Sequence, residues 1–67
     1  MITVTINGVP HTFADPFTFS QMLAQLDLTG KRLAVERNGE IVPRSQFGAA
    51  CLAAGDQLEI VIAVGGG

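Results

Sequence analysis

The 67-residue chain contains no tyrosine or tryptophan, one cysteine (Cys51) and one histidine (His11). A single cysteine cannot form a disulfide within the chain, which excludes a disulfide-held secreted scaffold and favours a reducing compartment. One histidine and one cysteine cannot make a structural zinc site without carboxylates or a second chain. No nucleophile–base pair, carboxylate pair or metal cluster can be assembled either, so we do not expect an independent enzyme.

Positive charge and long apolar runs are also scarce. Four cations, Lys31, Arg32, Arg37 and Arg44, stand against six acidic residues, giving a net charge of −2. They form no long basic patch, and binding of nucleic acid requires clustered cations and exposed aromatic rings, so we expect no nucleic-acid partner. There is no apolar run of about 18 residues and no basic segment ahead of an apolar one, so we expect no membrane partner and a soluble, cytoplasmic protein.

The residues that are present predict two β-hairpins and a further strand. Apolar and polar residues alternate over 2–6, and Asn7-Gly8 is a strong two-residue hairpin signal because both turn positions need positive φ. The same signal recurs at Asn38-Gly39. The predicted strands are Ile2–Ile6, Val9–Phe13, Leu33–Arg37, Glu40–Val42 and 57–64. Between the last two, we expect a helical turn or irregular loop at 43–47 and brief pairing at 50–52.

One helix is predicted after Asp15-Pro16. Thr18 and Gln21 are spaced as a capping box, with Thr18 at the N-cap. The apolar residues that follow lie on one helical face: Phe19, Met22, Leu23 and Leu26. Gly30 is the predicted C′ residue that ends the helix.

This order of elements predicts an α+β fold. A lone helix must bury its apolar face, and a sheet is the available partner. We therefore expect a β-grasp (ubiquitin-like) arrangement, a mixed sheet of about five strands packed on one main helix, formed by residues 1–64. Residues 65–67 then form a flexible glycine tail.

The parity of the last strand predicts an open sheet face. Leu58, Ile60, Ile62 and Val64 share one side and should face the helix, while Val61 and Ala63 share the other. Ala34 should lie on that same open side. We predict that the partner-docking surface consists of Val61, Ala63, Val64, Ala34 and Arg44. Ordinary surface apolarity is the alternative, and Arg44 fits a solvated loop cation equally well.

The chain ends in three glycines, Gly65, Gly66 and Gly67. Glycine has no Cβ, so such a tail can lie in a narrow groove and hold its carboxylate roughly 10 Å from the last ordered residue. This suits capture by the active site of another protein. A frayed terminus or a cloning remnant is the alternative.

Three segments together resemble the ubiquitin-like sulfur carriers, and among them the ThiS family of thiamine biosynthesis: NGEIVPR (38–44), GDQLEIV (55–61) and AVGGG (63–67). The resemblance implies a β-grasp fold, no catalysis of its own and no stably bound cofactor. It further implies that an E1-like adenylyltransferase uses ATP and Mg²⁺ to adenylate Gly67, which then becomes a thiocarboxylate. The sulfur would come from a cysteine desulfurase or a rhodanese-type persulfide, and thiazole synthase would receive it.

Other functions share parts of this pattern. A molybdopterin-type sulfur carrier or a ubiquitin-like protein modifier would use the same tail chemistry, although the molybdopterin relative usually reaches its Gly-Gly through a proline-containing segment, which is missing here. A ubiquitin-like interaction domain with an inert tail is the third possibility.

We expect structural rather than chemical roles for three polar residues. We expect Cys51 to be a small buried apolar residue, because its neighbours offer no cation that would favour the thiolate. We expect His11 to be an exposed strand residue without a catalytic partner. Asp56, after Gly55, is expected to stabilise a turn.

Overall fold

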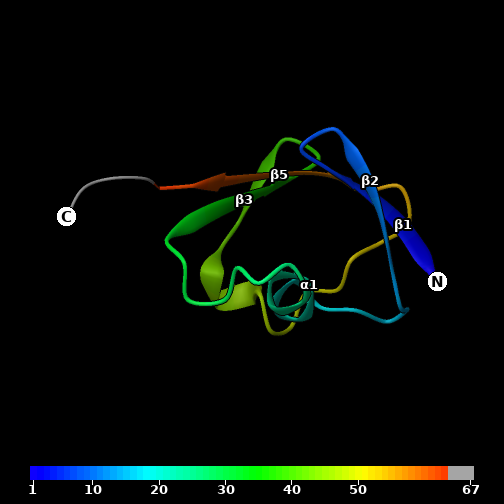
Figure 1. Cartoon of the computed structure of the whole chain (residues 1–67), viewed down its shortest axis with the longest axis horizontal. Coiled ribbons are helices and arrows are strands. Elements are labelled where there is room, and N and C mark those ends of the chain that lie inside the picture. The colour runs from blue at the N-terminus through cyan, green and yellow to red at the C-terminus, as the bar shows by residue number, and fades with distance from the viewer. Residues whose placement is uncertain (64–67) are drawn as a thin grey trace.

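The two Asn-Gly turns organise most of the sheet in the computed structural model, which describes residues 1–63 (Figure 1). The first joins strands β1 (Ile2–Ile6) and β2 (Val9–Phe13), and the second joins β3 (Leu33–Arg37) and β4 (Glu40–Val42). Asn7 and Gly8 have φ values of 49° and 83°, and Asn38 and Gly39 have 51° and 87°. Both turns therefore adopt the positive φ values that the sequence predicts.

The last strand, β5 (Gln57–Ile62), lies at the centre of the sheet. The strand order is β2-β1-β5-β3-β4, with β5 parallel to β1 and antiparallel to β3. β5 ends at Ile62 and not at Val64 as predicted from parity, although the Ala63 N–H still donates to the Arg32 carbonyl at 2.8 Å. Val64 and the three glycines lie outside the described residues.

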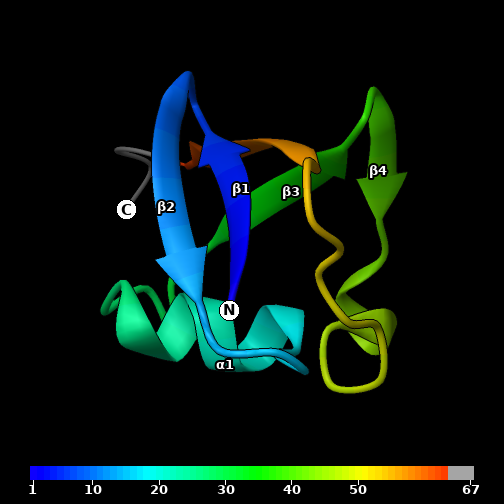
Figure 2. The ribbon, with the colours of Figure 1, turned by 90° about the vertical axis from the view of Figure 1, so that its right-hand side faces the viewer.

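The helix α1 (Phe19–Gln25) packs across one face of this sheet, as Figures 1 and 2 show. Its N-terminus has both hydrogen bonds of the predicted capping box: Gln21 N–H donates to Thr18 Oγ1 at 3.1 Å, and Thr18 N–H donates to Gln21 Oε1 at 2.8 Å. Phe19 and Met22 are fully buried between the helix and the sheet, against Val4 and Val35. These contacts give the predicted β-grasp fold.

The end of the helix corrects one prediction. The residue with left-handed backbone at C′ is Asp27, with φ 60°, and not Gly30. The Leu28 N–H donates to the Leu23 carbonyl at 2.8 Å and the Asp27 N–H to that of Ala24 at 3.1 Å, which is the Schellman pattern. Leu28 thereby returns to the core, so the helix ends before Gly30. Gly30, with φ 82°, belongs to the next turn, where the Lys31 N–H donates to the Leu28 carbonyl at 3.2 Å.

The long connection between β4 and β5 follows the sequence expectations. A single 3-10 turn covers Arg44–Gln46, and an isolated antiparallel bridge joins Thr18 to Cys51. Within residues 1–63, no helix has the length and apolar character needed to cross a membrane.

Candidate functional site

The face of the sheet away from α1 is open, as Figure 1 shows. Strand register places Ala34 opposite Val61 and Glu36 opposite both Glu59 and Ile41 on this face. Val61 is 60% exposed and Ile41 62% exposed, and Ala34 is also exposed. The predicted parity of Val61 and Ala34 is therefore confirmed.

Four of the five predicted docking residues lie around one shallow depression at the end of this face. Ala34, Val61, Ala63 and Arg44 line it together with Arg32 and Leu33. The fifth, Val64, lies outside the described residues. The structure thus brings the predicted residues together, and their role in docking remains a prediction. Arg32 was not among the predicted docking residues.

Ile62 departs from its predicted environment. It has the same parity as the buried Leu58 and Ile60, but it is 39% exposed. The strand runs past the region that α1 covers toward its C-terminal end (Figure 1). Ile62 instead lines a groove with Leu26 and Leu28 at the end of the helix.

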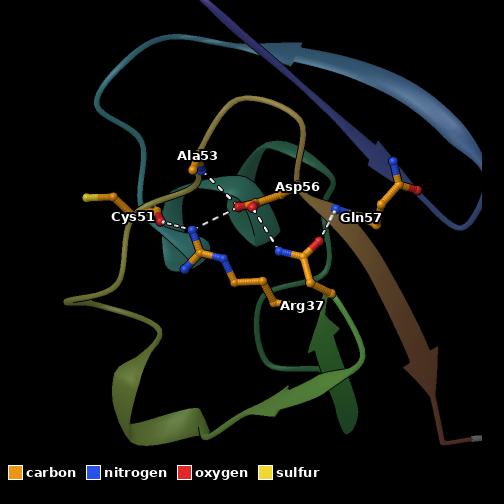
Figure 3. A network of polar contacts seen from close by, with 6 residues as sticks. Arg37, Cys51, Ala53, Asp56 and Gln57 are labelled. Carbon is orange, nitrogen blue, oxygen red and sulfur yellow. Dashed lines mark hydrogen bonds and ion pairs between the residues drawn. The ribbon is translucent and has the colours of Figure 1, made fainter.

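Asp56 is the buried centre of a polar network and does more than stabilise a turn (Figure 3). It is 6% exposed, and its Oδ2 pairs with Arg37 Nη2 at 2.9 Å and accepts from the Ala53 N–H at 2.8 Å. Arg37 Nη2 also donates to the Cys51 carbonyl at 3.0 Å, and its guanidinium lies 5.4 Å from the centre of the Phe19 ring. The sequence signal for this network was the helix-side parity of Arg37, since a cation on that side needs a partner.

Both turn asparagines bond to the backbone of β5. Asn7 Oδ1 accepts from the Ile60 N–H at 2.8 Å, and Asn7 Nδ2 donates to the Ile60 carbonyl at 3.0 Å. On the other side, Asn38 Oδ1 accepts from the Gln57 N–H at 2.9 Å, and its Nδ2 reaches Asp56 Oδ1 at 3.3 Å. The parallel ladder between β1 and β5 pairs only Thr5 with Gln57 and Ile6 with Leu58. The Asn7 amide therefore extends the attachment of β5 beyond that ladder.

Two further expectations are corrected. Cys51 is exposed, because the neighbouring Leu52 is the residue that enters the core. The carbonyl oxygen of Cys51, and not its sulfur, joins the network in Figure 3. His11 is half-buried rather than exposed, since its ring stacks on Phe13 with centroids 6.1 Å apart. Among residues 1–63, no cluster of three or more His, Cys, Asp or Glu side chains could hold a metal ion.

Known proteins match this chain over nearly its whole length. Residues 4–67 match the model of the ThiS family. The chain is 41% identical over 64 residues to a thiazole synthase of Paramagnetospirillum magneticum, an alignment that covers 96% of this chain and 20% of that protein. It is 36% identical over 66 residues to the uncharacterized protein ycf40 of Pyropia yezoensis, covering 98% and 93% of the two chains.

A solved structure has the same architecture. The crystal structure of a thiamine biosynthesis protein (ThiS) from Geobacter metallireducens superposes with a TM-score of 0.82 at 32% identity. The alignment covers 98% of this chain and 100% of that one. The likeness therefore includes the whole sheet and the helix, whereas the chain spans only 20% of the length of the thiazole synthase relative.

Proposed function

Since this chain belongs to the ThiS family, we propose that it is a sulfur carrier of thiamine biosynthesis, with the sulfur held as a thiocarboxylate on Gly67. The observation that carries this proposal is the family match over residues 4–67, which includes the three glycines. The chain acts in this proposal as a protein cosubstrate, and partner enzymes supply the catalysis.

The chemistry starts from an unreactive group. A carboxylate is a poor electrophile, because its charge repels nucleophiles and oxide is a poor leaving group. A carboxylate oxygen of Gly67 attacks the α-phosphate of ATP and pyrophosphate leaves, with Mg²⁺ and cationic groups of the adenylyltransferase stabilising the phosphoryl charge. A sulfur nucleophile then displaces AMP, which departs with one former carboxylate oxygen. If the nucleophile is a persulfide, a thiol reduces the resulting S–S bond and releases the thiocarboxylate.

The folded body fixes the point from which the last residues of the chain extend. β5 is held by β1 and Asn7 on one side and by β3 and Asn38 on the other, so residue 62 has a defined place. From there, residues 63–67 span at most about 17 Å when fully extended. Any enzyme that acts on Gly67 must therefore contact the body near the end of β5. The depression lined by Ala34, Val61, Ala63 and Arg44 lies there, which supports these residues as the docking surface.

The relatives favour thiazole synthase as the sulfur acceptor. In the Paramagnetospirillum protein of that name, the matching segment makes up 20% of the chain, so carrier-like and other sequence are covalently joined. Linkage raises the effective concentration of two modules that must meet. This supports thiazole formation over molybdopterin synthesis or protein modification. The proposed sulfur donor is a cysteine desulfurase or a rhodanese-type persulfide.

Intact mass spectrometry tests the carrier function. The protein is incubated with ATP, Mg²⁺, the adenylyltransferase and a sulfur donor, and fragmentation locates any exchange of oxygen for sulfur. We expect one exchange, at Gly67. Absence of the exchange, or an inert tail whose removal changes nothing, would refute the carrier function. Addition of thiazole synthase and its carbon substrates then tests the acceptor through consumption of the thiocarboxylate.

Variants of the tail test the role of glycine. Gly66→Val and Gly67→Val should keep the fold and abolish adenylation, because a branched side chain blocks a groove that admits glycine. Deletion of Gly67 should be equally damaging, since the reactive carbonyl retreats by about 3.5 Å. Pyrophosphate release measures adenylation, and release at the wild-type rate by any of these variants would contradict the threading of the tail.

A further inference from the structure

The open face of the sheet carries two glutamates directly opposite one another. Glu36 of β3 and Glu59 of β5 are register partners. Directly opposed side chains in an antiparallel pair have Cβ atoms about 4.5–5.5 Å apart, and like charges at this distance are destabilising. Within residues 1–63, neither carboxylate has an ion-pair or hydrogen-bond partner, since the one ion pair there joins Arg37 to Asp56. In the isolated fold, the two acidic side chains therefore start from opposed positions with no cation of residues 1–63 paired to either.

Apolar side chains surround this pair. Ile41 is the register partner of Glu36 on the other side and is 62% exposed. Val61 follows two residues after Glu59 on the same face, is 60% exposed and lies opposite Ala34. A partner that covers Ile41 and Val61 must also cover the two carboxylates between them. Burial of two carboxylates without a cation is strongly unfavourable.

We propose that this face binds a surface of the activating adenylyltransferase that places a basic side chain over Glu36 and Glu59 and apolar side chains over Ile41 and Val61. Arginine fits best, because its planar guanidinium has enough donors to bond two carboxylates at once. In the complex, this cation offsets both the repulsion between the two carboxylates and the cost of removing them from water. A partner without a cation at this place is rejected, so the pair also provides specificity.

The opposite charges at the end of the face fix the orientation of docking. Arg32 and Arg44 line the depression next to Val61 and Ala63, beyond the glutamate pair. A complementary partner offers acidic groups there and a basic group over the glutamates. A reversed partner would oppose like charges at both ends. This orientation places Ala63, which lines the depression, at the acidic end of the partner surface.

The choice of the adenylyltransferase rests on the proposed function. If Gly67 is the site of adenylation, the short reach of residues 63–67, at most about 17 Å, brings that enzyme against this part of the body. The glutamate pair then lies within the contact rather than beside it, because Glu59 is three residues from the end of β5 at Ile62.

Isosteric and charge-reversing variants test the proposal. Glu36→Gln combined with Glu59→Gln removes both charges without changing side-chain volume. Glu40→Gln is the matched control. Glu40 is an exposed residue of the neighbouring β4 strand, but its register partner is Arg37, so it lies on the helix side of the sheet and not on the open face. Binding of each full-length protein to the adenylyltransferase is measured by surface plasmon resonance at low and physiological salt. We expect at least tenfold weaker binding for the double variant, or about 1.4 kcal/mol, with slower association and a weaker salt dependence.

Glu59→Lys separates binding from folding. In the free protein the new lysine lies opposite Glu36 and replaces a repulsion with an attraction, so the melting temperature should rise. In the complex it repels the partner cation, so binding should fall by more than tenfold. Wild-type affinity of the double variant or of Glu59→Lys would overturn the proposal, as would a loss of affinity confined to thiazole synthase.

Sulfur loading distinguishes this proposal from the carrier function. If the wild-type protein acquires no sulfur at Gly67, the carrier function fails and so does the assignment of the partner. If the wild-type protein loads and the double variant loads with unchanged kcat/KM, only the docking proposal fails. We expect the wild-type protein to load, Glu40→Gln to match it within twofold, and the double variant to show a raised KM with little change in kcat.

Discussion

The attachment of β5 by the Asn7 side chain leads to a quantitative prediction for Asn7→Gly. Glycine adopts the positive φ of this turn position without strain, so the variant removes the side-chain bonds and leaves the backbone conformation intact. Two hydrogen bonds to Ile60, of 2.8 and 3.0 Å, are lost. The Ile60 residue is only 7% exposed, so water replaces these bonds poorly.

The expected cost is a large part of the stability of a domain of this size. Each hydrogen bond contributes about 0.5–1.5 kcal/mol, and a poorly solvated backbone group left without a partner adds to this. We expect a loss of about 2–3 kcal/mol from a total of roughly 3–10 kcal/mol. For a domain of this length, the melting temperature should fall by about 10–20 °C.

Urea denaturation measures this loss. The free energy of unfolding of Asn7→Gly is compared with that of Asp27→Gly, a matched control at another left-handed position whose side chain makes no hydrogen bond within residues 1–63. The control should differ from the wild type by less than about 0.5 kcal/mol. Asn7→Asp keeps an acceptor for the Ile60 N–H but places an oxygen against the Ile60 carbonyl, so it should also be destabilised. A loss below about 0.5 kcal/mol for Asn7→Gly would refute the reasoning.

The remaining predictions concern the polar network, the cysteine and the docking face. Asp56→Ala should lower the free energy of unfolding by about 2–3 kcal/mol, because it removes the anionic partner of Arg37 and the acceptor of the Ala53 N–H. A melting temperature within 2 °C of the wild type (about 0.5 kcal/mol) would contradict this. Cys51→Ser should leave both stability and sulfur loading unchanged, since the side chain is exposed, and native Cys51 should react with a thiol reagent as fast as an unfolded control. Ala34→Asp should weaken binding to the adenylyltransferase about tenfold, because it places a charged group opposite Val61, where the partner is apolar. Unchanged affinity in a variant that stays folded by circular dichroism would exclude this part of the face from the contact.

Local signals in the sequence were sufficient for most of the fold. Asn-Gly dipeptides require positive φ at both turn positions, and the capping box at Thr18 and Gln21 is read from spacing alone. Alternating parity correctly placed Val61 and Ala34 on the open face. These features depend on residues that are close together in the sequence, so they could be predicted from it.

Features that depend on distant residues were missed or misplaced. The helix ends at Asp27 rather than Gly30 because Leu28 packs back onto the core, and a tertiary contact outweighs the usual preference for glycine. Cys51 is exposed because the loop orients Leu52 inward. The bonds from Asn7 to Ile60 span 53 positions along the chain, and no short motif predicts them.

At the candidate site, the glutamate pair also could not be predicted from local sequence patterns. Glu59 is exposed and Glu36 is half-buried, both at ordinary strand positions, and their opposition follows only from the register between β3 and β5. Parity predicts which face a residue occupies, but the cross-strand neighbour comes from the register. The predicted docking residues therefore included the apolar groups and Arg44 but neither acid.

The central position of β5 has a consequence during synthesis. β1 and β3 belong to separate hairpins and are joined through the strand that leaves the ribosome after them. Before residues 57–62 emerge, a nascent chain holds two ribbons without a shared sheet, and the groups that later form the core remain exposed. A translation product that stops short of β5 is consequently open to proteolysis and cannot accumulate as a folded competitor for the partner enzymes.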